Sequence, residues 1–98
     1  MRCAALRRIF FTEEVTAMET RVALIAVIVE NPASTEKLNA VLHEYRDHII
    51  GRMGIPYREK KISVMSIVVD APNDVINALS GKVGRLDGVS AKTICSNV

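Results

Sequence analysis

The chain has 98 residues, of which 49% are hydrophobic, and its 13 Lys and Arg against 11 Asp and Glu give a formal net charge of +2. This length and apolar content predict one domain with a modest core, and the charge is too small to indicate a nucleic-acid partner. No apolar run approaches the roughly 18 residues of a membrane span, and two cysteines are too few for a disulfide framework, so we expect a cytoplasmic protein without a membrane partner.

The first 17 residues stand outside the pattern that organises the rest of the chain. They include the basic and apolar run Arg7–Phe11, and the following Met18 could itself begin a protein. We therefore divide the chain into an N-terminal extension, residues 1–17, and one domain, residues 18–98. Two interpretations of the extension stay open: a dispensable tail, or a short helix that docks on the domain.

A first strand is predicted over residues 21–30, because its interior, Val22 to Val29, is continuously apolar. Asn31 can cap the helix that follows, and Pro32 suits the first helical position because its missing N–H is not needed there. Apolar residues then recur at helical spacing, at Leu38, Val41, Leu42 and Tyr45.

The second half of the chain repeats this pattern roughly 40 residues later. A short edge strand, about residues 48–53, and a basic hairpin, residues 54–61, precede a third strand over residues 62–70. A second helix starts at Asn73, where Asp74 is placed favourably against the helix dipole. Its apolar positions are Ile76, Leu79, Val83 and Leu86. Asp87 and Gly88 then turn the chain into the last strand, residues 89–95.

A strand–helix–strand unit that occurs twice predicts an α+β ferredoxin-like βαββαβ sandwich, an antiparallel four-stranded sheet with two helices on one face. In the third strand Val64 and Val68 point to one face of the sheet, whereas Met65, Ile67 and Val69 point to the other. Two helices cover one face only, so the opposite face would expose an apolar patch of the kind that marks an interface. We therefore expect a homodimer or a larger homo-oligomer, unless the N-terminal segment folds over that face.

Chain direction in this fold brings a candidate binding site together at one end of the sheet. The first helix begins there with free backbone N–H groups, beside the basic hairpin and the end of the second helix. This combination suits a carboxylate or phosphate, and hence a small anionic metabolite. The expected ligand-binding residues are Asn31, Ser34, Arg52, Arg58, Lys60 and Arg85. The alternative is that the basic hairpin is a solvated loop with the usual charges of a sheet edge.

Other chemistries find little support in the sequence. His48 and Cys95 fall on opposite edge strands, so a metal site built from them and His43 would need two subunits, and we expect neither metal nor cofactor. No nucleophile has a nearby His and acid, and no glycine-rich phosphate loop is present, so we do not expect an enzyme. The two central strands lack the aromatic residues on which RNA-recognition domains stack bases, which argues against direct nucleic-acid binding.

Two segments, Gly51–Lys60 with the strand that follows and Ala78–Val89, resemble a known family. They are similar to the small ACT-like proteins of the regulator family of the iron-only (FeFe) hydrogenase system in anaerobic bacteria, over roughly residues 19–95. The resemblance implies a homo-oligomeric regulatory protein without established chemistry. ACT domains hold amino acids at a turn with Gly where this chain has Ala33, which argues against an amino-acid ligand. A protein-interaction module without a small-molecule ligand, and a metal-responsive regulator, are the alternative functions.

Overall fold

The computed structural model describes residues 19–96. The predicted N-terminal extension lies outside the described residues, and with it the alternative that this segment covers one face of the sheet.

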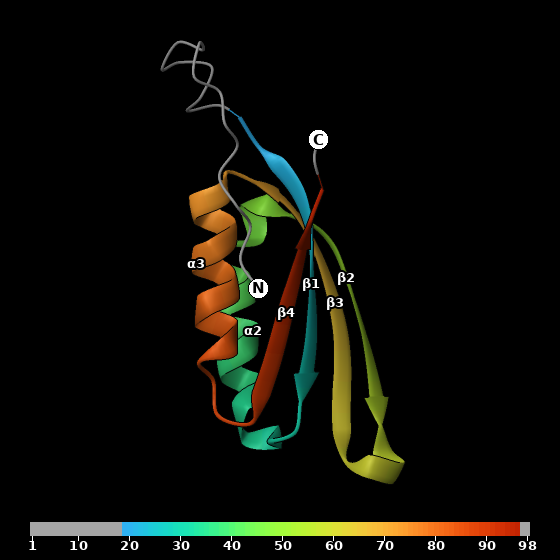
Figure 1. The fold of residues 1–98 in the computed structure, drawn as a ribbon. Helices are drawn as coiled ribbons and strands as arrows, with labels where there is room; N and C mark the ends of the chain where they lie inside the picture. The colour runs from blue at the N-terminus through green and yellow to red at the C-terminus, as the bar shows by residue number, and fades with distance from the viewer. Residues whose placement is uncertain (1–18, 97–98) are drawn as a thin grey trace.

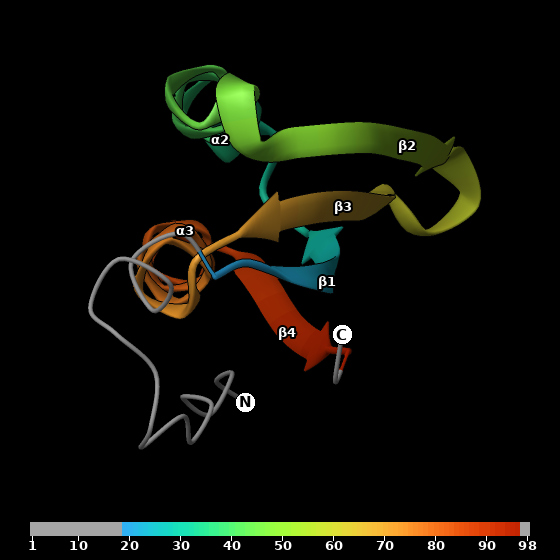
Figure 2. The ribbon, with the colours of Figure 1, turned by 90° about the horizontal axis from the view of Figure 1, so that it is seen from above.

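Four strands and two helices alternate in the order that the sequence predicts. The elements are β1 (Arg21–Val29), α2 (Thr35–Glu44), β2 (Ile49–Tyr57), β3 (Ile62–Ala71), α3 (Asn73–Gly84) and β4 (Val89–Cys95), with short 3-10 turns η1 (Pro32–Ser34), η2 (Arg46–His48) and η3 (Arg58–Lys60). All pairings are antiparallel and the strand order is β2-β3-β1-β4. Both helices lie on the same side of the sheet (Figures 1 and 2). The ferredoxin-like fold is therefore confirmed.

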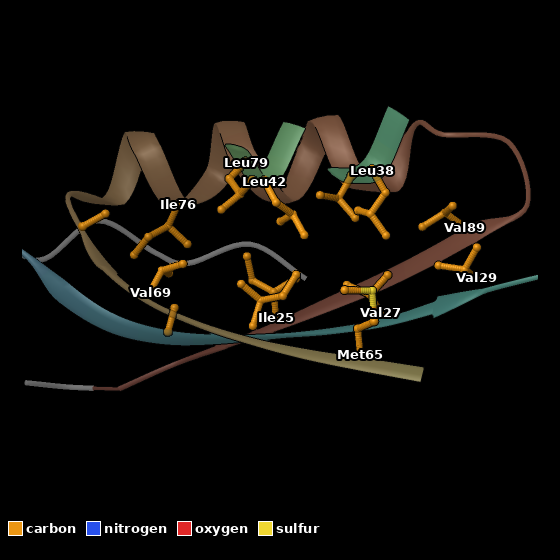
Figure 3. Close-up of a cluster of buried hydrophobic side chains, with 14 residues drawn as sticks. Ile25, Val27, Val29, Leu38, Leu42, Met65, Val69, Ile76, Leu79 and Val89 are labelled. Atoms are coloured by element: carbon orange, nitrogen blue, oxygen red, sulfur yellow. The ribbon is translucent and has the colours of Figure 1, made fainter. Parts of the chain in front are cut away.

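The core lies between the sheet and the two helices (Figure 3). Burial alternates strictly along β1, where every odd-numbered residue faces the helices. Ile25 of β1 is paired with Ile67 of β3, and both side chains are fully buried. The helices contribute the apolar stripes that the sequence predicts: Leu38, Leu42, Ile76, Leu79 and Val83.

The first helix starts as predicted, through a 3-10 turn. The side chain of Asn31 caps η1 by accepting the backbone N–H of Ala33, and Pro32 occupies the first position of that turn. The second helix also starts at the expected residue, Asn73, and the carboxylate of Asp74 accepts the N–H of Val75 in its first turn.

The edge strand is longer than the sequence predicts, and this prediction was wrong. β2 runs from Ile49 to Tyr57 instead of ending near residue 53, and Pro56 pairs with Ser63 of β3. A proline within a strand is tolerated here because β2 lies at the edge of the sheet. The turn of the hairpin is thereby reduced to η3 and Lys61, which adopts a left-handed φ of 56°. The β2–β3 hairpin consequently projects beyond the helical layer (Figure 1).

The face of the sheet turned away from the helices is apolar and exposed. We call it the open face, and its large hydrophobic residues are Val22, Leu24, Ile28, Met53, Ile55, Tyr57, Val64 and Ile94. The predicted division of β3 between the two faces is confirmed, because Val64 is exposed whereas Met65, Ile67 and Val69 are buried. No helix in the described part of the chain combines the length and apolar composition that a membrane crossing requires.

Candidate functional site

The loop that leaves β1 is tied to the loop that enters β4. The side-chain Nδ2 of Asn31 donates to the carboxylate of Asp87 at 2.8 Å, and the backbone N–H of Glu30 donates to the carbonyl of Gly88 at 2.7 Å. The buried Ser34 adds a third bond, from its hydroxyl to the carbonyl of Asp87. We call these contacts the loop clamp. They fix the start of the first helix against the end of the second.

The start of the first helix does not offer the free N–H groups that the sequence analysis expects. The N–H of Ala33 donates to the side-chain oxygen of Asn31 at 3.0 Å, and that of Ser34 donates to its backbone carbonyl at 2.9 Å. The N–H of Thr35 donates to the carbonyl of Pro32. Because these three donors already have acceptors, they are not available to an anion in this conformation.

A groove separates the start of the first helix from the projecting hairpin. We call it the hairpin groove; its volume is about 280 Å³ and its lining residues are Val29, Pro32, Thr35, Pro56, Tyr57, Arg58, Lys61, Ile62 and Ser63. Two cations and no carboxylate are among these lining residues. A positively charged wall beside an apolar one suits an amphipathic anion, such as a small carboxylate or phosphate that carries an apolar part.

The structure brings only some of the predicted ligand-binding residues to this groove. Arg58 lines it, whereas Lys60 is exposed in η3 and does not. Asn31 and Ser34 lie next to the groove, with their polar atoms held in the loop clamp. Arg85 lies back along α3, with its guanidinium beside Gly81.

Arg52 belongs to a different part of the molecule from the hairpin groove. Its Nη2 donates to the side-chain oxygen of Asn39 in α2, at 3.0 Å. Conversely, sequence reasoning missed Tyr57 and Lys61, which line the hairpin groove. Tyr57 reaches the hairpin groove because β2 extends to residue 57, and Lys61 reaches it because its left-handed backbone turns the chain back into β3. Neither the length of β2 nor the left-handed φ of Lys61 has a local signal in the sequence.

The residues considered for a metal site are not clustered. His48 ends η2 beside one edge strand and Cys95 ends the opposite edge strand, as the sequence analysis expects. Within residues 19–96, no group of three or more His, Cys, Asp and Glu side chains is arranged to hold a metal ion.

Comparisons with known proteins place this fold and these segments in one family. Residues 21–93 match the family model described as "TM1266-like: Iron-only hydrogenase system regulator, putative". No curated protein gives a significant match. Among solved structures, the uncharacterized protein TM1266 from Thermotoga maritima is 33% identical, with a TM-score of 0.76 over 79% of this chain and 98% of that chain.

A second solved structure is similar in fold alone. A formyltetrahydrofolate deformylase from Pseudomonas putida KT2440 is 13% identical, with a TM-score of 0.58 over 79% of this chain and 29% of that chain. This chain thus corresponds to less than a third of the deformylase. The family match, in contrast, spans most of the chain, and the chain belongs to the TM1266-like family.

Proposed function

We propose that this TM1266-like protein is a non-catalytic regulatory subunit that assembles as a homodimer or larger homo-oligomer and senses a small anionic metabolite in the hairpin groove. The observation that carries the proposal is the placement of Arg58 and Lys61 in a groove next to the first strand–helix loop. The proposed setting is the iron-only hydrogenase system, because that is how the family is described.

The open face supports self-association. Met53 is 64% exposed, Ile55 58% and Ile94 66%, and they continue the apolar row of the central strands. A hollow of about 310 Å³ lies on the same face, where the small side chains Ala26, Ser66 and Ser90 leave room between larger ones. A second copy of the chain would fill this hollow and remove apolar surface from water, which contributes about 25 cal/mol per Å² buried.

The hairpin links the two parts of the proposal. Tyr57 lines the hairpin groove and also ends the row of β2 residues on the open face. An anion held by Arg58 and Lys61 would draw the projecting hairpin toward Pro32 and Thr35. Because the strands of that hairpin carry part of the open face, ligand binding would bias the association of subunits, which is the coupling that a sensor needs.

A thermal-shift and calorimetric screen with amino acids, nucleotides, phosphate esters and carboxylates tests the ligand. We expect at least one anion to raise the melting temperature, and the double variant Arg58→Ala/Lys61→Ala to abolish that shift while leaving the sedimentation coefficient unchanged. Lys60→Ala is the control, since it removes one positive charge from the same hairpin outside the groove, where the double variant removes two inside it. If Lys60→Ala and the double variant behave alike, the groove is not the ligand site.

Analytical ultracentrifugation at micromolar concentration tests the assembly. The expected result is a species of at least twice the 10.8 kDa chain mass. A folded monomer under these conditions would contradict the proposed oligomer, whatever the ligand screen shows.

A second candidate function is a protein-interaction module that binds no small molecule. The edge strand β2 favours it, because all its residues after Ile49 are exposed, Ile50 at 63% included. An exposed edge strand can accept a strand from another protein. The absence of any response in the ligand screen, together with capture of a partner that Ile50→Lys abolishes, would favour this candidate.

A further inference from the structure

A second groove lies between α2 and the first half of β2, separate from the hairpin groove. Its lining residues are Asn39, Leu42, His43, Arg46, Ile49 and Arg52, and its volume is about 310 Å³. None of these residues lines the hairpin groove. The buried Leu42 and the half-buried Ile49 form an apolar floor, and the four polar side chains are exposed around it. We call it the α2–β2 groove.

The polar side chains of this groove present hydrogen-bond donors held in place by the fold. Arg52 donates from Nη2 to Oδ1 of Asn39 at 3.0 Å, and Arg46 donates from Nη1 to the carbonyl of His43 at 2.9 Å. A guanidinium has donors only, so the amide oxygen of Asn39 faces Arg52 and its Nδ2 donor remains free to face a ligand. Each guanidinium is fixed at one nitrogen and retains further N–H groups for another acceptor.

The positive charge of the α2–β2 groove is not balanced by any acidic residue among its lining residues. Arg46 and Arg52 line it together with the imidazole of His43, and no carboxylate is among the six lining residues. Two guanidinium groups that face one small space repel each other, and an anion placed between them is attracted to both and so offsets that repulsion. An anion with several oxygen atoms would also accept hydrogen bonds from groups that approach from α2, η2 and β2.

We propose that the α2–β2 groove binds the phosphate group of a small metabolite. A phosphate monoester carries up to two negative charges and three acceptor oxygens, which match two guanidinium groups and the Asn39 amide better than a carboxylate does. The apolar floor of Leu42 and Ile49 accommodates the adjoining carbon atoms. The site goes beyond the proposed function, because it lies outside the hairpin groove and neither requires the other.

The position of the groove gives phosphate binding a structural consequence. The bond between Arg52 and Asn39 joins β2 to α2, and a phosphate bound by Arg46 and Arg52 would add further bridges between the helical layer and the edge strand. β2 also carries Met53 and Ile55 of the open face. Phosphate binding would therefore restrain a strand that contributes exposed apolar residues to that face.

The test is an NMR titration of the full chain with inorganic phosphate and glycerol phosphate, with acetate as the carboxylate probe, all at one ionic strength. We expect saturable amide shifts at Asn39, His43, Arg46 and Arg52 with both phosphates, and weaker binding of acetate. Arg46→Gln and Arg52→Gln should each weaken phosphate binding about tenfold or more, since each removes a charged hydrogen bond.

Lys37→Gln is the matched control, because it removes one positive charge from an exposed position of α2 that lines neither groove, and it should leave phosphate affinity unchanged. Arg46→Gln is the safer of the two test variants, since Arg46 is exposed and its side chain bonds only a carbonyl of the preceding turn among the contacts described. Non-saturable shifts, shifts centred on Arg58 and Lys61, or equal binding of acetate would each overturn the proposal. These outcomes leave the test of the hairpin groove untouched, since that test uses other variants.

Discussion

Gly88 is the residue whose backbone leaves least room for any other side chain. Its φ is +70°, and a Cβ built on it would lie 2.5 Å from the Cβ of Asn31 and 3.0 Å from its backbone nitrogen. Gly88→Ala should therefore lower the free energy of unfolding by about 2 kcal/mol or more, because the left-handed backbone and the clash in the loop clamp add. Urea denaturation followed by circular dichroism measures this change.

Gly84→Ala is the matched control for Gly88→Ala. Gly84 ends α3, and a Cβ there would meet nothing within 4 Å. The substitution should stabilise the protein by up to about 1 kcal/mol, since alanine is the better helix former and restricts the unfolded chain. Equal effects of the two substitutions would mean that the loop clamp does not constrain residue 88.

The loop clamp also shows how much of the candidate site could be predicted from the sequence. The sequence predicts Asn31 and Ser34 as ligand-binding residues because they supply polar groups at the start of a helix. In the structure both bond to Asp87, more than 50 residues away along the chain, so their polar atoms serve the fold. Local sequence shows the donor and acceptor capacity of a side chain, whereas only the tertiary fold shows which partner satisfies it.

At the scale of the elements, α2 and α3 are joined by one surface ion pair. Lys82 donates from Nζ to Glu44 at 2.9 Å and lies 5.1 Å from the centre of the Tyr45 ring. The hydrogen bond to Glu44 is the largest cause of a raised pKa at Lys82, and the bond to Tyr45 is the next. The contribution of Lys82 to stability is thus fully present below its unfolded pKa of 10.5 and is lost as the pH rises through the higher folded value.

Glu44→Gln should lower the pKa of Lys82 toward 10.5, because it removes the charged acceptor. An NMR titration of the Lys82 Cε and Nζ signals measures this shift. Glu36→Gln, at the opposite end of α2, is the control and should leave the Lys82 titration in place. An unchanged Lys82 pKa in Glu44→Gln would mean that the ion pair is not formed in solution.

The apolar stripe of α2 leads to a second prediction at the scale of the elements, which concerns the free energy of unfolding. Leu38 is 1% exposed in the core, so Leu38→Ala should cost about 2–5 kcal/mol of unfolding free energy. Val41 of the same helix is only partly buried, and Val41→Ala should cost about 1 kcal/mol or less because less surface is lost and alanine favours the helix. Denaturant midpoints measure both; a larger loss at Val41 would contradict the position of the helix.

Periodicity was sufficient to predict the order of the elements and the two faces of the sheet. The alternation in β1 and β3 and the stripes of the two helices depend on repeated burial, and repeated burial leaves a repeated pattern in the sequence. The prediction ended β2 too early, because a proline such as Pro56 usually marks the end of a strand. Whether a proline is tolerated depends on whether its strand lies at the edge of the sheet, which is a property of the assembled fold.

At the scale of the whole molecule, β2 and the hairpin connect the two candidate binding grooves with the face through which we expect subunits to associate. The hairpin projects past the helices (Figure 1), and the open face extends onto it through Met53, Ile55 and Tyr57. The two grooves lie on the other side, one at each half of β2. A single edge strand thus joins two candidate anion sites to the candidate subunit interface, so a ligand in either groove could alter association without contacting the partner.

If two copies associate through the open face, folding and association are linked, and unfolding must depend on protein concentration. Raising the concentration a hundredfold stabilises a dimer by about 2.7 kcal/mol, so the wild-type melting temperature should rise by several degrees. Leu24→Lys places a charge on the central strand of the open face and should remove this dependence. Ala40→Lys adds the same charge at an exposed position of α2 and should retain it. Differential scanning calorimetry at two concentrations measures the melting temperatures of the wild type and the two variants. A wild-type melting temperature that does not depend on concentration would argue that the open face is used for something other than self-association.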